Sequence, residues 1–405
     1  MPRQTYLRFN HFAGKNLHLG VCGSVAAYKT LELLRAWKDV GIDITVTLTP
    51  GAGEFVTPMS CLSLGASKVY GPMMGLDDIF AHLEPGQKAD AMLIMPATAT
   101  TIARLAIGDA SEMLAAQALA FDKPKVIAPA MHPRMWGNPA TKANWRLLLE
   151  RGFLPVNPGS GVMACGDSGE GRLADVRDIY LAALRALSAQ DMAGQTLLVT
   201  IGPTREFWDG VRFVSNPSSG LMGAAIAAAA WVRGAKVKAV CGPGVPWLPT
   251  EVERVNVDSA VEMLAACEAV WADCTLGCFA AAVCDYRPAE QGSEKLKKES
   301  LGDALALALS RNPDIAASLG AKKTASQRSI VFAAETSDLK SNAMKKLASK
   351  NADMIVGNIV GAPGVGFESE NNQVSLLDKT GGVLDLPVMS KADIAWRIWD
   401  VFLKL

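Results

Sequence analysis

A single thiol stands in a loop whose composition is typical of a reaction site. Residues 164–172 read Ala-Cys-Gly-Asp-Ser-Gly-Glu-Gly-Arg, so Cys165 lies among glycines and acidic residues. A thiol is mostly protonated at pH 7 and can donate a proton. Most free cysteines are instead buried as small apolar side chains, but the polar surroundings of Cys165 favour a proton donor.

Two short runs of small residues could bind phosphate groups. Residues 20–29 read Gly-Val-Cys-Gly-Ser-Val-Ala-Ala-Tyr-Lys, and residues 215–220 read Ser-Asn-Pro-Ser-Ser-Gly before an alanine-rich helical pattern. Backbone amides and the helix dipole at such turns attract anions. The first run lacks the GxGxxG and GxxxxGK[ST] spacings, which disfavours a dinucleotide or P-loop motif. In the second run a plain N-cap would explain only one serine.

Charged side chains in the second half could bind a nucleotide. Asp285 follows an apolar strand pattern, where a carboxylate can hold Mg²⁺ or nucleotide hydroxyls. Lys346 and Lys350 would share one helix face, as a phosphate clamp requires. Lys295 lies in a stretch rich in lysine and glutamate, where a single lysine is usually only solvated.

Strand and helix patterns alternate through the first half and must position these groups. Apolar runs at residues 17–22, 91–95 and 126–130 predict strands, and residues 42–49 alternate like a strand. Helical spacing extends over residues 26–40. Strands separated by helices indicate a parallel sheet covered on both faces.

The same pattern begins again after a polar stretch at residues 188–194. We expect strands at 196–200 and 236–241, a helix at 219–233, a hairpin turning at Gly381-Gly382 and a closing amphipathic helix. The predicted fold class is therefore α/β, with two Rossmann-like three-layer domains at residues 1–190 and 191–405.

Composition limits the partners that the chain could have. Its 405 residues include 40 basic and 40 acidic side chains, and this balance argues against nucleic acid as a partner. The N-terminus shows no secretory signal, and the most lipid-like stretch, residues 221–232, is shorter than the ~20 residues that span a bilayer. Eight cysteines without such a signal predict reduced thiols. We expect a cytoplasmic protein without a membrane partner.

The first half resembles the flavin-binding cysteine decarboxylases over about residues 16–185. The resemblance rests on residues 23–29, His82, Met-Pro-Ala-Thr-Ala-Thr-Thr at 95–101, Pro-Ala-Met-His-Pro-Arg-Met-Trp at 129–136, and the loop of Cys165. It implies an N-terminal flavoprotein domain with FMN as cofactor. The flavin-binding positions that it implies are Gly23, Ser24, Thr49, Pro96, Ala97, Thr98 and Thr101.

The resemblance also implies a reaction and its catalytic residues. FMN oxidises a cysteinyl thiol to a thioaldehyde, loss of carbon dioxide leaves an enethiolate, and reduced flavin with a proton donor restores the thiol. Cys165 matches the proton donor, and His82 matches a histidine that acts as a base or orients the substrate carboxylate; a solvent-facing histidine is the alternative. His132 stands where the family usually has an asparagine that holds the carboxylate, and histidine donates with a different geometry.

The second half resembles the phosphopantothenate–cysteine ligases in unbroken order over about residues 194–400. The matching segments are residues 202–206, 211–220, 281–287, 294–298, 311–315, 332–336, 366–367 and 371–372. A ligase domain behind a decarboxylase-like domain resembles the bacterial bifunctional proteins of coenzyme A biosynthesis. The resemblance implies that 4′-phosphopantothenate and cysteine are joined through an acyl-cytidylate made from CTP.

The ligase resemblance assigns residues to this chemistry. Asn216 matches the residue that holds the acyl-cytidylate, Lys295 matches a lysine that can counter charge at the mixed anhydride, and Asp285 would bind Mg²⁺. Leu221 replaces a family lysine that could meet a phosphate. The implied substrate- and nucleotide-binding positions are Ser218, Ser219, Gly220, Phe279, Ala280, Ala281, Asp285, Lys295, Pro313, Asp314, Ile315, Ala316, Phe332, Lys346 and Lys350.

Three hypotheses about function follow. The leading one is a bifunctional enzyme that ligates 4′-phosphopantothenate to cysteine and then decarboxylates the product to 4′-phosphopantetheine. The second keeps the ligase and makes the first domain a silent flavin-binding assembly or regulatory module, because His132 departs from the family. The third is a flavoprotein regulator, against which the complete ligase series argues. The resemblance implies a homo-oligomer in which decarboxylase trimers are joined through ligase dimers, as in a dodecamer.

Overall fold

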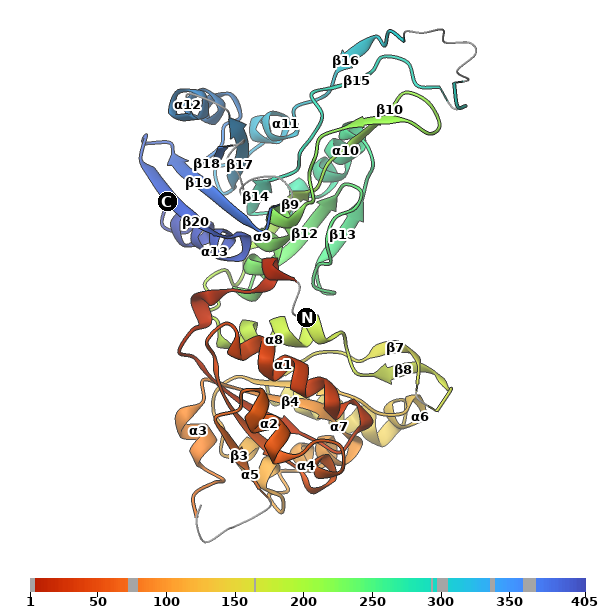
Figure 1. Ribbon diagram of the computed structural model, residues 1–405, viewed down its shortest axis with the longest axis vertical. Coiled ribbons are helices and arrows are strands. Elements are labelled where there is room, and N and C mark those ends of the chain that lie inside the picture. Colours follow the sequence, from red (N-terminus) through yellow and green to blue (C-terminus); the bar gives the residue numbers. More distant parts are fainter. Residues whose placement is uncertain are drawn as a thin grey trace. The chain divides into compact units, whose positions relative to one another are not determined.

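The chain forms two compact units in the computed structural model (Figure 1). The structure describes residues 4–71, 79–163, 165–292, 294–296, 305–335, 339–359 and 369–405. The first unit holds residues 10–189, and the second holds residues 5–9 together with 190–405. Each unit is built on a largely parallel sheet, so the predicted α/β class is confirmed.

Six parallel strands form the sheet of the first unit in the order β3-β2-β1-β4-β5-β6. The strands are β1 (Asn16–Val21), β2 (Asp43–Leu48), β3 (Lys68–Tyr70), β4 (Ala91–Ala97), β5 (Lys125–Pro129) and β6 (Phe153–Pro155). The order reverses between β1 and β4. In open parallel sheets a crevice for ligands forms at the carboxyl ends of the strands at such a reversal.

Helices and one hairpin complete the first unit. The predicted helix at 26–40 is divided into a 3-10 turn (Val25–Tyr28) and α1 (Lys29–Lys38). The ring of Trp37 in α1 stacks on that of Tyr180 in α8, with centroids 6.2 Å apart. The helices are α1, α2 (Pro58–Leu64), α3 (Glu84–Lys88), α4 (Ala99–Ile107), α5 (Met113–Leu119), α6 (Pro133–Trp136), α7 (Pro139–Glu150) and α8 (Val176–Leu187); the hairpin is β7 (Gly159–Val162) with β8 (Ser168–Arg172).

Eight strands form the main sheet of the second unit in the order β13-β12-β9-β14-β17-β18-β19-β20. They are β9 (Thr196–Ile201), β12 (Lys236–Cys241), β13 (Glu253–Asn256), β14 (Leu276–Phe279), β17 (Arg328–Glu335), β18 (Met354–Ile359), β19 (Asn371–Asp378) and β20 (Val383–Ser390). The order reverses again, between β9 and β14. The predicted hairpin is confirmed: β19 and β20 pair antiparallel, and Gly381 takes a φ of 83° in the turn.

The remaining elements of the second unit are five helices and two short hairpins within the described residues. The helices are α9 (Leu221–Val232), α10 (Ala260–Trp271), α11 (Ile315–Ala321), α12 (Leu339–Ser349) and α13 (Lys391–Phe402); the hairpins pair β10 (Arg205–Phe207) with β11 (Phe213–Ser215), and β15 (Tyr286–Pro288) with β16 (Leu309–Arg311). None of the helices in the described part of the chain combines the length and apolarity needed to cross a bilayer.

Helix α9 is the buried centre of the second unit. Its residues from Gly223 to Val232 are all buried, which explains why it is apolar on every side. Alanine side chains let it lie close to the sheet and to α13, where the indole N–H of Trp399 donates to the carbonyl of Ile226 at 3.2 Å. The N-terminal segment also joins this core, because the ring of Phe9 lies 5.5 Å from that of Trp396.

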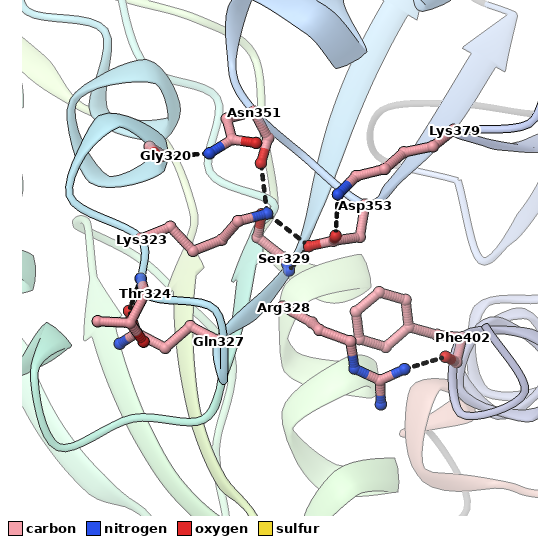
Figure 2. A network of polar contacts seen from close by, with 10 residues as sticks. All are labelled: Gly320, Lys323, Thr324, Gln327, Arg328, Ser329, Asn351, Asp353, Lys379 and Phe402. Atoms are coloured by element: carbon pink, nitrogen blue, oxygen red, sulfur yellow. Dashed lines mark hydrogen bonds and ion pairs between the residues drawn. The ribbon is translucent and has the colours of Figure 1, made fainter.

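A polar network fastens the amino ends of β17 and β18 (Figure 2). The carboxylate of Asp353 accepts from the ammonium groups of Lys323 at 2.7 Å and Lys379 at 2.5 Å, and from the backbone N–H of Ser329 at 2.7 Å. Burial opposes the charge, but the hydrogen bonds from the two lysines leave the pKa of Asp353 below its usual range. The network thus holds the amino ends of these two strands together.

Candidate functional sites

The carboxyl ends of β1 and β2 meet through two closely packed loops in the first unit. Gly23 and Ser24 follow β1, and Thr49 follows β2, with its N–H donating to the carbonyl of Val21 at 3.0 Å. A Cβ atom on Gly23 would lie 2.8 Å from the backbone carbon of Gly51, so only glycine allows this approach. Backbone rather than side chains thus forms this contact between the two loops, and exposed backbone N–H groups at such strand ends suit a phosphate group.

The amino end of α4 follows β4, the strand that pairs with β1 on its other side. Pro96 and Ala97 end β4, and the Thr98 hydroxyl then accepts from the N–H of Thr101 at 3.3 Å. Burial raises the pKa of Cys22 to about 11 despite its hydrogen bonds to Thr101 and Thr98, so this thiol stays neutral. The free N–H groups of α4 and the hydroxyls fit a phosphate-bearing cofactor. All seven predicted flavin-binding positions thus lie at or just beyond the carboxyl ends of three neighbouring parallel strands, β1, β2 and β4, or in the first turn of α4.

Cys165 is the one exposed thiol of the chain; the other seven cysteines are buried. It lies with Asp167 in the turn between β7 and β8, here called the thiol turn (residues 165–167). Nε2 of His132 lies 2.7 Å from Oδ2 of Asp167, and Nδ1 accepts from the N–H of Arg134 at 3.2 Å. Because Nδ1 is an acceptor, the ring proton lies on Nε2 and is donated to Asp167.

His132 is therefore tied to the thiol turn. Ligand atoms of His132, Cys165 and Asp167 lie within 4.8 Å of one another, a grouping that could also hold a metal ion in competition with the donor role of the thiol. The predicted contact of His132 with a substrate carboxylate requires its N–H to leave Asp167. Sequence reasoning did not include Asp167, although it stands in the quoted loop.

We expect opposite results from two substitutions of His132. Asparagine can cap α6 as the His132 ring does, while its amide N–H groups become available to a carboxylate, so His132→Asn should preserve or raise decarboxylation. His132→Ala removes both the cap and the contact with Asp167 and should lower decarboxylation about 10-fold. Carbon dioxide release measures both effects, and an alanine variant as active as the wild type would contradict this role.

A buried polar chain supports the segment that carries His82. Nδ1 of His18 lies 2.8 Å from the hydroxyl of Thr45, and Nε2 lies 3.1 Å from Oε1 of Gln117. The amide of Gln117 donates in turn to the carbonyl of Ala81 at 2.9 Å. His82 is half-buried in the turn before α3, and among the described residues no hydrogen bond or ion pair links it to the thiol turn.

His18 should make the first unit sensitive to acid. Burial lowers the pKa of His18 from 6.5 to about 4, although its hydrogen bond with Gln117 acts in the opposite direction. Between these values only the unfolded chain binds the proton, so the free energy of unfolding should fall by ~3 kcal/mol from pH 6.5 to 4. Urea unfolding of His18→Asn should lose this pH dependence, while the exposed His11→Asn should retain it; equal slopes would contradict the assignment.

One cavity of about 480 Å³ lies at the strand reversal of the second unit. It is bounded by the ends of β9, β14, β17 and β18 and by the first turns of α9, α11 and α13. Every predicted ligase position except Lys295 lines it: Asn216, Ser218, Ser219, Gly220, Phe279, Ala280, Ala281, Asp285, Pro313, Asp314, Ile315, Ala316, Phe332, Lys346 and Lys350. The sequence motifs therefore converge on a single site.

The loop after β14 is held rigid along this cavity. The hydroxyl of Thr200 accepts from the N–H of Ala281 at 3.2 Å, and that of Thr204 accepts from Cys284 at 3.1 Å. The amide of Asn216 donates to the carbonyl of Val283 at 3.0 Å, which fixes this side chain against the same loop. Such anchoring keeps backbone groups in place for a ligand without further ordering.

Charges of both signs line the cavity. The exposed carboxylate of Asp285 follows the end of β14 and could hold Mg²⁺ with a nucleotide. Lys346 of α12 and Lys350, in the turn directly after that helix, both line the cavity, where they could act as a phosphate clamp. Nζ of Lys350 lies 3.3 Å from Oδ2 of Asp314, the residue that caps α11.

Lys295 lies outside the cavity lining and is exposed. Its neighbour Leu296 donates its N–H to the carboxylate of Asp209 at 3.3 Å, and the carbonyl of Leu296 accepts from Arg212 at 3.3 Å. These bonds attach the Lys295 segment to the β10–β11 hairpin. Of the quoted motifs, residues 164, 297–298, 336 and 366–367 lie outside the described residues.

Comparison with known proteins matches both units. A family described as "DNA/pantothenate metabolism flavoprotein C-terminal domain" matches residues 192–405, and one described as "Flavoprotein" matches residues 10–187. The "Coenzyme A biosynthesis bifunctional protein CoaBC" of Escherichia coli (strain K12) is 41% identical over 392 residues, covering 96% of each chain. That of Bacillus subtilis (strain 168) is 37% identical over 390 residues, covering 95% of each. A crystal structure of a CoaBC C-terminal domain is 36% identical, covers 53% of this chain and 97% of its own, and has a TM-score of 0.46.

Proposed function

The chain belongs to the family of the coenzyme A biosynthesis bifunctional proteins, and on this premise we propose how its residues carry out the two reactions. As a member, it is an enzyme that joins 4′-phosphopantothenate to cysteine and decarboxylates the product to 4′-phosphopantetheine. The observation that carries the assignment of residues is the convergence of the ligase motifs on one cavity.

The ligase reaction takes place in the cavity of the second unit, with CTP and Mg²⁺ as co-substrate and metal. Asp285 holds the metal, while Lys346 and Lys350 face the polyphosphate. Asn216, fixed by the carbonyl of Val283, holds the acyl-cytidylate until the amine of cysteine displaces CMP. Lys295 counters the charge that develops at the mixed anhydride.

The decarboxylase reaction takes place at the carboxyl ends of β1, β2 and β4 in the first unit, where the glycine turn and the start of α4 would hold FMN. Flavin bound there supplies oxidation of the substrate thiol and the later return of the electrons. The thiol turn brings Cys165 to the substrate, where it gives its proton to the enethiolate left by loss of carbon dioxide. His82 and His132 orient the substrate carboxylate. Trimers of the first unit joined through dimers of the second would form the assembly.

The experiment that tests this proposal is a reaction of the purified protein with 4′-phosphopantothenate, cysteine, CTP and Mg²⁺, with products resolved by mass. We expect phosphopantothenoylcysteine to form first and 4′-phosphopantetheine to follow, from a yellow protein that retains non-covalent FMN. A colourless protein that takes up no added flavin would contradict the decarboxylase part of the proposal. Failure to form phosphopantothenoylcysteine would contradict the ligase part of the proposal.

A second candidate function has one observation in its favour. The Nε2 proton of His132 is engaged by Asp167, so the group that replaces the family asparagine has no N–H free for a substrate carboxylate in this conformation. The first unit could then serve as a flavin-holding module without turnover. Accumulation of phosphopantothenoylcysteine by the wild-type protein, without decarboxylation, would favour this alternative.

A further inference from the structure

A lysine that no motif singled out lines the ligase cavity. Lys391 is the first residue of α13, and only 4% of its surface is exposed. Its backbone N–H donates to the carbonyl of Glu370 at 3.2 Å. Its ammonium forms neither an ion pair nor a hydrogen bond with any other described residue, although it borders the cavity. A buried ammonium without a counter-charge is costly.

Two buried amides border the same cavity. Asn358, near the end of β18, is 9% exposed, and its Oδ1 atom is buried without a hydrogen-bond partner. Asn372 of β19 is 3% exposed, and its Oδ1 accepts from the N–H of Gln373 at 3.0 Å. Three polar side chains from three different elements therefore border one cavity, and the Oδ1 atom of Asn358 is left without a partner.

The position of Lys391 suits an anion. The first turns of α9 and α13 line the same cavity, and the amino end of α9 presents free N–H groups to it. Leu221 and Met222 begin α9, so that helix start provides no cation. Lys350, by contrast, is already close to Asp314. Burial lowers the pKa of Lys391, and no carboxylate in the part of the chain that the structure describes opposes this shift; a bound anion would restore the charged form.

We propose that Lys391, with the amides of Asn358 and Asn372, forms a subsite that binds a phosphoryl group of a ligase substrate. The subsite deepens the proposed ligase function and rests on it. Two substrates carry such a group: CTP, through its polyphosphate, and 4′-phosphopantothenate, through its phosphate. The ammonium of Lys391 supplies a positive charge in the cavity, where Leu221 has replaced a family lysine. Binding of the phosphoryl group offsets the desolvation cost of keeping the ammonium buried.

Steady-state kinetics of pyrophosphate release distinguish the two sources. Lys391→Met keeps an unbranched, flexible side chain and removes the charge, and we expect it to raise the KM of one phosphorylated substrate at least ~10-fold. The KM for the other phosphorylated substrate and for cysteine should change less than about twofold. Lys391→Arg should recover part of the loss. Lys404→Met, an exposed lysine just beyond the same helix, is the matched control and should behave as the wild type.

Binding and stability provide readouts that do not need turnover. Tripolyphosphate and inorganic phosphate should raise the Tm of Lys391→Met clearly less than the Tm of the wild-type protein and of Lys404→Met, because Lys346 and Lys350 remain in the same cavity. Without ligand, Lys391→Met should be as stable as the wild type or more stable, because it removes a buried unpaired charge. Unchanged KM values with equal phosphate stabilisation would overturn the subsite. If the wild-type protein showed no ligase turnover but still bound phosphate in a manner that depends on Lys391, the proposed ligase function would be overturned and the phosphate subsite would stand.

Discussion

Cys165→Ser should bind flavin and release carbon dioxide, yet form almost no 4′-phosphopantetheine. A hydroxyl is a far weaker acid than a thiol, so the enethiolate would not be protonated. General acid catalysis typically contributes 10²- to 10⁴-fold, and we expect a loss of roughly that size in the complete reaction. The released product should be an oxidised enethiol, two hydrogens lighter than 4′-phosphopantetheine. Anaerobic single-turnover reactions followed by mass spectrometry measure it.

Because Cys165 is exposed, its replacement should affect the reaction without affecting the stability of the fold. Replacing an exposed side chain should change the free energy of unfolding by less than about 0.5 kcal/mol. Cys61, buried in α2 of the same unit, provides the control: a folded Cys61→Ala protein should complete the reaction. Normal 4′-phosphopantetheine from Cys165→Ser would show that another group donates the proton.

Lys295→Gln should abolish formation of phosphopantothenoylcysteine while leaving the fold intact. The side chain is exposed, so little stability depends on it. Removing one group that stabilises transition-state charge typically costs 10²- to 10³-fold in kcat, and we expect roughly that loss in ligation. Because Lys295 lies outside the cavity lining, catalysis requires its segment to reach bound substrate. Pyrophosphate release measures the ligase step directly.

The control for Lys295 is another exposed lysine of the same unit. Lys236 lies on β12 outside the cavity lining, and Lys236→Gln should retain wild-type kinetics. Decarboxylation of added phosphopantothenoylcysteine should be unchanged in both variants, since that reaction uses the first unit. If Lys295→Gln ligated at the wild-type rate, Lys295 would be a solvated surface lysine without a role in catalysis.

The type and order of most elements could be predicted because the spacing of apolar residues along the sequence follows the buried face of each helix or strand. Strands expected at 196–200 and 236–241 are β9 and β12, each within one residue. The helix expected at 26–40 was partly wrong: the Ser24 hydroxyl accepts from the N–H of Ala26 and starts a 3-10 turn before α1. Such local hydrogen bonding leaves no mark on hydrophobic periodicity.

Contacts between distant residues limited prediction of the sites. His132 and Asp167 are 35 positions apart, and only the fold brings the thiol turn to the start of α6. Lys391 resembles a solvated lysine at the start of an amphipathic helix, since its burial comes from the packing of α13 beside β19 and α9. Resemblance identified the positions that line the cavity, but the unsatisfied amide of Asn358 required coordinates.

The N-terminal segment has a consequence for dissecting the enzyme. Residues 5–9 belong to the second unit although residues 10–189 belong to the first, so the polypeptide passes between the units after residue 9 and again after residue 189. A ligase fragment that begins at residue 190 would leave Trp396 without the ring of Phe9 and the carbonyl of Trp247 without the hydroxyl of Tyr6. A single cut of the chain therefore cannot yield two complete units. An isolated ligase unit needs residues 5–9 supplied as a separate peptide or fused at a new terminus.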